Sequence, residues 1–178
     1  MAASIFIVTL QDFLTRTLIS RNVNTDKLKT EISSTQEKYG RKILCEDFYT
    51  EVLNVVAGTA SSAVINTLLP YIRDFLVYKT YARYLVSSPV SMTPAGARVQ
   101  VDPNSNPASD KQYGEMIAQA KNDANYYQDR LVNFLELNED DYPTWKNSIC
   151  NCGDKRVKTL NKLSLVGNVR RDTPITWT

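Results

Sequence analysis

Two long segments with apolar residues at helical spacing constrain the fold of this chain more than any other feature. Ten apolar side chains recur every three or four residues between Ser61 and Val86, and nine do so between Tyr113 and Leu135. Stripes of this length predict helices that each pack along one face. Shorter patterns at Leu10–Ser20, Thr25–Tyr39 and Ile43–Val56 complete an expected all-α fold, a small bundle of four to five helices.

Polar residues, glycines and a proline predict where these helices begin and end. Thr9 is a candidate cap of the first helix, Asn24 or Thr25 of the second, and Ser109 with Gln112 forms a capping box before the last. Gly40 is expected to end the second helix and Gly58 the third. Pro70, within the fourth segment, is expected to kink that helix or to begin its second half.

A proline-rich loop separates the two longest segments. Ser87–Pro107 holds four prolines, yet Ala97, Val99 and Val101 alternate with polar residues, which predicts a short strand or hairpin. Gly96 can adopt a positive φ and so permits a tight reversal. Loops of about twenty residues are uncommon in small domains and are usually functional or disordered.

The chain is expected to divide into a helical domain at residues 1–149 and a basic C-terminal arm at residues 150–178. The arm holds six basic and two acidic residues, and its apolar side chains are three residues apart. Such a pattern favours docking on an acidic protein or a phosphate; the alternative is a disordered, solubilising terminus. The expected docking residues are Lys155, Arg156, Lys158, Leu160, Leu163, Arg170 and Arg171.

The chain has no histidine, which removes Ser-His-Asp and Cys-His catalysis and histidine metal sites. It also lacks phosphate-binding glycine loops and a Gly-x-Ser-x-Gly motif, so neither an enzyme activity, a cofactor nor a metal is expected. The uncharged stretch from Val52 to Ile72 is too polar to span a bilayer. Three basic residues opposite the stripe of the fourth helix are expected to face solvent: Arg73, Lys79 and Arg83.

Four sequence stretches together resemble a known family. They are YIRDFLVYKTYARYL, the turn SxxSMTPAGARV, the helix KQYGEMIAQAKNDANYYQDRLVNFL and a closing YPTWKNS. In this order they resemble head-to-tail connector proteins of tailed bacteriophages, most of all those of crAss-like and other Bacteroidetes phages. The likeness spans about residues 9 to 148 and includes no catalytic signature.

The resemblance implies a structural virion protein, made in the host cytoplasm, that forms a ring in the phage neck. Such a ring, usually a dodecamer, joins the portal to the tail, extends the channel for double-stranded DNA and carries the next neck or tail protein. The loop residues expected to face the lumen or a neighbouring subunit are Thr93, Pro94, Gly96 and Arg98. The alternative is a cytoplasmic helical nucleic-acid-binding or regulatory protein that uses the basic arm, and whose affinity would fall steeply with salt.

Overall fold

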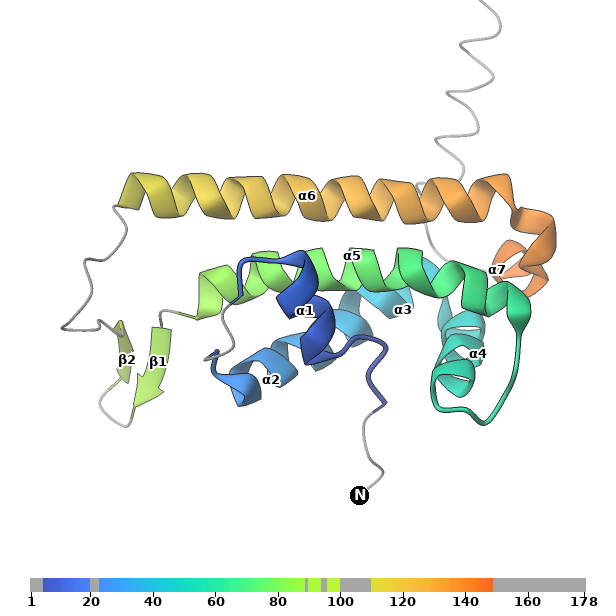
Figure 1. Cartoon of the computed structure of the whole chain (residues 1–178), viewed down its shortest axis with the longest axis horizontal. Coiled ribbons are helices and arrows are strands. Elements are labelled where there is room, and N and C mark those ends of the chain that lie inside the picture. Colours follow the sequence, from blue (N-terminus) through green and yellow to red (C-terminus); the bar gives the residue numbers. More distant parts are fainter. Residues whose placement is uncertain (1–4, 20–22, 89, 94–95, 100–109, 149–178) are drawn as a thin grey trace, which may run out of the picture. The chain divides into compact units, whose positions relative to one another are not determined.

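The structure, a computed structural model, describes residues 5–19, 23–88, 90–93, 96–99 and 110–148 (Figure 1). The expected all-α bundle is confirmed. Its helical elements are α1 (Leu10–Arg16), α2 (Thr25–Thr35), the π-helical turn η1 (Gln36–Gly40), α3 (Arg41–Leu44), α4 (Glu46–Val56), α5 (Ala63–Ser87), α6 (Asp110–Leu137), the 3-10 turn η2 (Glu139–Asp141) and α7 (Pro143–Asn147). The helical unit ends at Ser148.

Helix α5 is the centre of the bundle. It contacts α6 along one side and α1, α2 and α4 on others, and α6 runs antiparallel to it (Figure 1). Along the α5–α6 contact, Tyr71 stacks on Phe134 and Tyr78 on Tyr127, each with ring centroids 4.2 Å apart. The tyrosines of the fourth segment therefore pack within the bundle, as its helical spacing predicts.

Two predicted helix caps are confirmed, whereas the third helix, expected from Ile43, is interrupted at Cys45 and α4 begins at Glu46. Thr9 forms a capping box with Asp12, and the side chain of Asn24 accepts a hydrogen bond from the Lys27 backbone N–H. Helix α5 begins after Ser62, whose hydroxyl accepts from the backbone N–H of Ile65 at 3.2 Å. Ser109 lies outside the described residues.

The predicted helix ends are confirmed only in part. Gly58 does follow α4 and has a φ of 74°. Gly40, however, does not end a helix: its φ is −62°, and the chain continues through η1 into α3. The first helix ends at Arg16, four residues before Ser20, while α5 is continuous through Pro70.

Gly40 lies inside a helical stretch, at a place where α5 passes close to it. A side-chain carbon added at Gly40 would lie 3.5 Å from Leu76 Cδ2 and 3.8 Å from Tyr49 Cε2, which is ordinary van der Waals contact. The position therefore has room for a methyl group, and the helical stretch stops only at Cys45, which has a φ of 68°.

Gln36, in the π-helical turn, holds the N-terminal segment to the bundle. Its side-chain oxygen accepts a hydrogen bond from the backbone N–H of Ile7 at 2.9 Å, and its Nε2 donates to the Ile5 carbonyl at 2.8 Å. Nε2 also donates to the Tyr49 hydroxyl at 3.1 Å. This buried amide thus connects three parts of the chain.

The closing YPTWKNS stretch forms α7, which the helical patterns did not predict. The Trp145 side chain is 2% exposed, and its Nε1 donates to the Ile43 carbonyl at 3.0 Å. The hydroxyl of Tyr142 donates to the Val64 carbonyl at 3.1 Å. Helix α7 therefore fixes the C-terminal end of α6 against α3, α4 and α5.

The proline-rich loop contains the expected hairpin. Strands β1 (Val90–Thr93) and β2 (Gly96–Val99) pair antiparallel, with Ser91 opposite Arg98 and Thr93 opposite Gly96. The reversal thus falls between Thr93 and Gly96, at residues 94–95, which lie outside the described residues.

Candidate functional site

The structure brings three of the expected loop residues onto one hairpin. Thr93 and Gly96 are its last cross-strand pair, and Arg98 is two positions further along β2. Pro94 and the whole predicted docking arm, Lys155, Arg156, Lys158, Leu160, Leu163, Arg170 and Arg171, lie outside the described residues. The sites therefore remain predictions.

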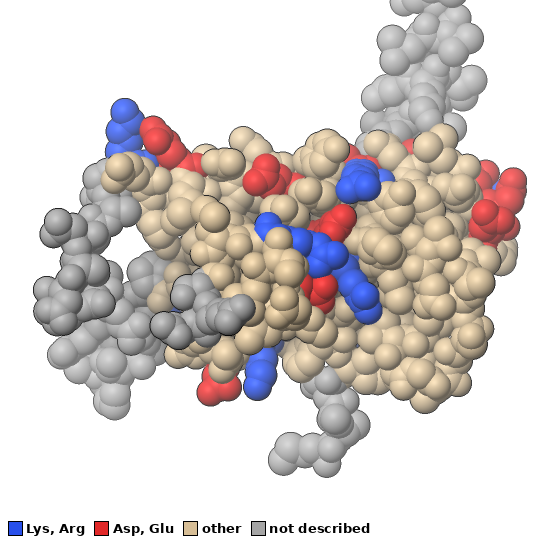
Figure 2. Space-filling model, in the orientation of Figure 1, with Lys and Arg blue, Asp and Glu red and all other residues tan. Residues whose placement is uncertain are grey.

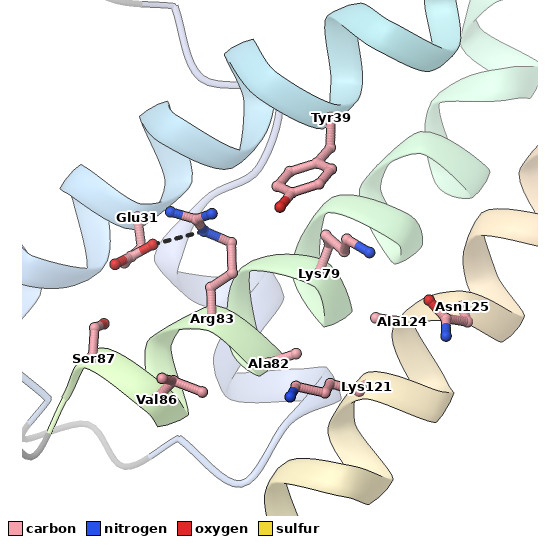
Figure 3. A pocket seen from close by; sticks show the side chains of 10 residues that line it. All are labelled: Glu31, Tyr39, Lys79, Ala82, Arg83, Val86, Ser87, Lys121, Ala124 and Asn125. Carbon is pink, nitrogen blue, oxygen red and sulfur yellow. Dashed lines mark hydrogen bonds and ion pairs between the residues drawn. The ribbon is translucent and has the colours of Figure 1, made fainter. Parts of the chain in front are cut away.

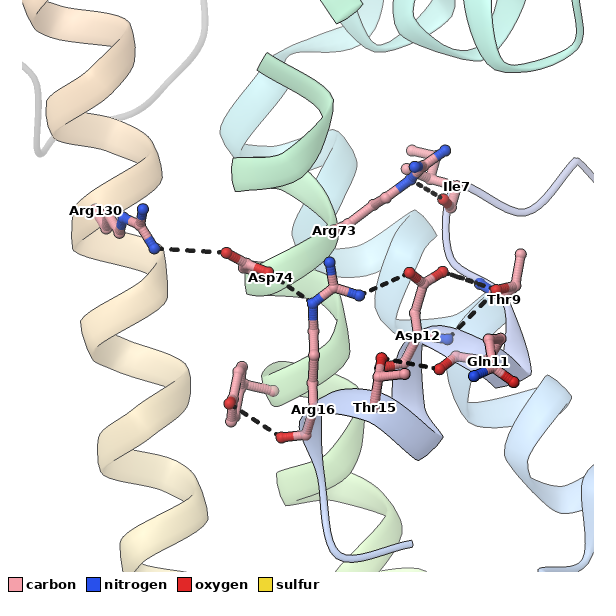
Figure 4. A network of polar contacts seen from close by, with 10 residues as sticks. Ile7, Thr9, Gln11, Asp12, Thr15, Arg16, Arg73, Asp74 and Arg130 are labelled. Atoms are coloured by element: carbon pink, nitrogen blue, oxygen red, sulfur yellow. Dashed lines mark hydrogen bonds and ion pairs between the residues drawn. The ribbon is translucent and has the colours of Figure 1, made fainter. Parts of the chain in front are cut away.

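A network of charged groups joins α1 to α5 and α6 (Figure 4). Arg16 Nη1 lies 2.7 Å from Asp12 Oδ1, and its Nε lies 2.9 Å from Asp74 Oδ1. Arg130 of α6 approaches the other oxygen of Asp74 at 3.5 Å. Burial alone would raise the pKa of Asp12, but hydrogen bonds from Thr9 and Arg16 lower it. These groups satisfy one another, which indicates a structural clamp.

Two basic residues expected to face solvent are engaged in the fold instead. Arg73 Nε donates to the Ile7 carbonyl at 3.1 Å, which adds a second attachment of the N-terminal segment. Arg83 Nε lies 2.9 Å from Glu31 Oε2, so it pairs α5 with α2. The expectation is wrong for Arg73 and Arg83 because the neighbouring segments supply acceptors that the pattern of one helix does not reveal.

A pocket of about 490 Å³ lies between α2, η1, α5 and α6 (Figure 3). Three basic side chains and one acidic side chain line it, which gives a formal charge of +2; these are Lys79, Arg83, Lys121 and Glu31. Its apolar lining comes from Ala82, Val86 and Ala124, and Val86 is 52% exposed. The pocket thus combines positive charge with an exposed apolar surface.

Tyr39 lies among the basic side chains of this pocket. The ammonium of Lys79 lies 4.9 Å from the centre of the Tyr39 ring. Burial would raise the pKa of Tyr39, but a hydrogen bond from Arg83 and the charges of Lys38, Arg83 and Lys79 lower it. Among the described residues, no acidic side chain forms an ion pair with Lys79 or Lys121. The pocket is therefore suited to an additional negative group.

The opposite charge gathers where α6 ends. Glu139, Asp140 and Asp141 follow one another in η2, and Lys146 pairs with the first two at 3.3 and 2.6 Å. Red atoms lie at the end of the face in Figure 2 where Figure 1 places the C-terminal end of α6. Leu137, two residues before Glu139, is 78% exposed, so an apolar side chain lies beside the acidic turn, which together with Lys146 has a formal charge of −2.

A second hollow, of about 450 Å³, lies between α5 and α6 near the same end. Tyr126, which is 63% exposed, and Leu137 are on its rim, while Arg130 covers the Tyr71 ring at 4.9 Å. A large exposed tyrosine and a large exposed leucine on one helix are typical of an interaction surface.

The sequence patterns single out neither the pocket nor the acidic turn, and Lys121 is not among the expected site residues. No local signal joins Glu31, Tyr39, Lys79 and Lys121, because their positions span ninety residues and meet only through tertiary packing. Within the described residues, no group of three or more acidic or cysteine side chains is placed to hold a metal ion.

None of the helices among the described residues has the length and apolar character needed to cross a membrane. The family of unknown function DUF6712 matches residues 40–155, which is more than half of the chain. Neither the curated proteins nor the solved structures include a match.

Proposed function

We propose that this chain, which belongs to the family of unknown function DUF6712, is a structural virion protein that forms a ring in the neck of a tailed bacteriophage. The ring would join the portal to the tail, extend the DNA channel and carry the next neck or tail protein. The role is one of assembly, without enzyme activity or cofactor.

One observation carries this proposal: within the described residues, α6 packs along α5 and leaves two large side chains exposed. These are Tyr126 and Leu137, which are 63% and 78% exposed. A subunit of a closed ring needs two different surfaces that each bind a neighbour. The basic pocket and the acidic end of α6 are two such surfaces, of opposite charge, on one subunit.

The order of the elements agrees with the resemblance to head-to-tail connector proteins. The helix YIRDFLVYKTYARYL lies in α5, the SxxSMTPAGARV stretch contains both strands of the hairpin and the long amphipathic segment forms α6. In a ring, the hairpin with Thr93, Pro94, Gly96 and Arg98 would face the lumen or the next subunit. The basic arm would dock on the portal or on a neighbouring ring.

The proposal is tested on purified virus particles and on the purified chain. Mass spectrometry of the particles should detect the chain in multiple copies, and electron microscopy should show it as a ring between portal and tail. Absence of the chain from purified particles would overturn the proposal. In that case, binding of the full chain to duplex DNA, with an affinity that falls steeply as salt rises, would favour the nucleic-acid-binding alternative.

A further inference from the structure

The basic pocket and the acidic end of α6 are complementary in two respects. The pocket has a formal charge of +2 and the acidic turn with Lys146 one of −2. The pocket also has an exposed apolar side chain, Val86, and the turn is preceded by the exposed Leu137. The two surfaces therefore have opposite charges, and each has an apolar side chain for the other to contact.

One copy cannot bring these two surfaces together. Lys121 and Leu137 are sixteen residues apart on the continuous helix α6. A helix rises 1.5 Å per residue, so they are about 24 Å apart along its axis. Because α7 fixes the end of α6 through Trp145 and Tyr142, the turn cannot fold back towards the pocket.

We propose that the acidic end of α6, residues 137–141, of one copy docks in the basic pocket of the next copy. Carboxylates of the turn approach Lys79 and Lys121, while Leu137 packs against Val86 at the rim. This inference names the contact between subunits of the proposed ring and in that sense rests on the proposed function. The contact joins two different surfaces, so it repeats around a ring when the rotation between copies closes.

The partner is a second copy of this chain because the pocket is only partly basic. Glu31 lies within it and pairs with Arg83, and its remaining lining is largely apolar. A phosphate backbone is bound through many cationic contacts, whereas a short acidic segment with one leucine matches both the charge and the apolar area of this pocket. Binding of a phosphate group instead is one outcome of the test.

The test uses two charge reversals in the full chain, Lys121→Glu and Asp141→Lys. Asp141 is exposed and forms no ion pair among the described residues, so its reversal leaves the contacts of Lys146 intact. Each variant alone places like charges in the contact and should weaken self-association, measured by sedimentation equilibrium, by about tenfold or more. Lys111→Glu and Glu115→Lys, reversals at exposed positions elsewhere on α6, are the matched controls and should leave it unchanged.

Mixing the two variants is the decisive step. In an equimolar mixture, the turn of Asp141→Lys meets the pocket of Lys121→Glu, and the two remaining native surfaces meet each other. Association should therefore return to within about threefold of the unchanged chain, whereas two variants damaged in folding would not rescue one another. Circular dichroism of each variant checks that the helices are retained.

Failure of the inference can be told apart from failure of the proposed function. If the unchanged chain stays monomeric at millimolar concentration, or the mixture is no better than the single variants, the inference is overturned. The inference is also overturned if Lys121→Glu abolishes the binding of inorganic phosphate but leaves self-association unchanged. A ring in virus particles would still support the proposed function in each case, while rescue on mixing by a chain absent from particles would support the contact alone.

Discussion

Two glycine substitutions test directly whether the helical stretch before Cys45 is continuous. At Gly40 the backbone is helical, and an added methyl group would make ordinary van der Waals contact with Leu76 and Tyr49. Alanine is favoured over glycine in a helix by about 1 kcal/mol, so Gly40→Ala should stabilise the fold by about 0.5 to 1 kcal/mol. At Gly58 the φ of 74° disfavours a side chain, although no atom lies within 4 Å, and Gly58→Ala should destabilise by about 1 kcal/mol.

The assay is urea denaturation of the full chain and both variants at one protein concentration, followed by circular dichroism. The two free energies of unfolding should differ by about 2 kcal/mol and in opposite directions from the parent. For a chain of this size, that gap corresponds to about 4 to 8 °C in melting temperature. If Gly40→Ala destabilises as much as Gly58→Ala, Gly40 ends a helix after all, and the continuity of η1 and α3 is wrong.

Three further predictions use the same denaturation assay. Gln36→Met should destabilise by about 2 to 4 kcal/mol, since it leaves the buried Ile7 N–H without a partner, while Gln119→Met at an exposed position should change stability little. Burial raises the pKa of Tyr49 to about 12. The neutral hydroxyl therefore contributes its full stability below about pH 10, and this contribution to the free energy of unfolding is lost as the pH rises towards 12. Tyr49→Phe should reduce the loss of stability at alkaline pH. Deletion of residues 150–178 should leave the free energy of unfolding nearly unchanged, because the described core ends at Trp145. The deletion should also weaken docking to a portal or neighbouring ring. A truncated chain that fails to fold would show that the arm is part of the core.

The helices could be predicted from the sequence because their signals are local. The stripes of α5 and α6 and the caps at Thr9 and Asn24 depend on residues within four positions of one another. The alternating residues around Arg98 likewise sufficed to predict the hairpin. Signals of such short range can be recognised in the sequence without knowledge of the fold.

Gly40 shows where local reasoning fails. A glycine after a helical pattern most often ends it, and nothing nearby in the sequence contradicts that interpretation. The chain nevertheless continues through η1 into α3, with Gly40 packed near Leu76, thirty-six residues away. The expectation for Arg83 is wrong because its partner Glu31 lies on another helix. A local pattern contains neither of these tertiary neighbours.

The acidic end of α6 is ordered through its attachment to α3 and α4. A free helix terminus frays, and a docking segment that frays must be ordered when it binds, which lowers affinity. Here Trp145 is buried and bonded to Ile43, and Tyr142 packs edge-on against Phe48 at 5.7 Å between ring centroids. These contacts order η2 before any partner arrives. Helix α7 therefore holds the backbone of η2, and its Lys146 pairs with Glu139 and Asp140, so a neighbouring copy would meet a preorganised surface.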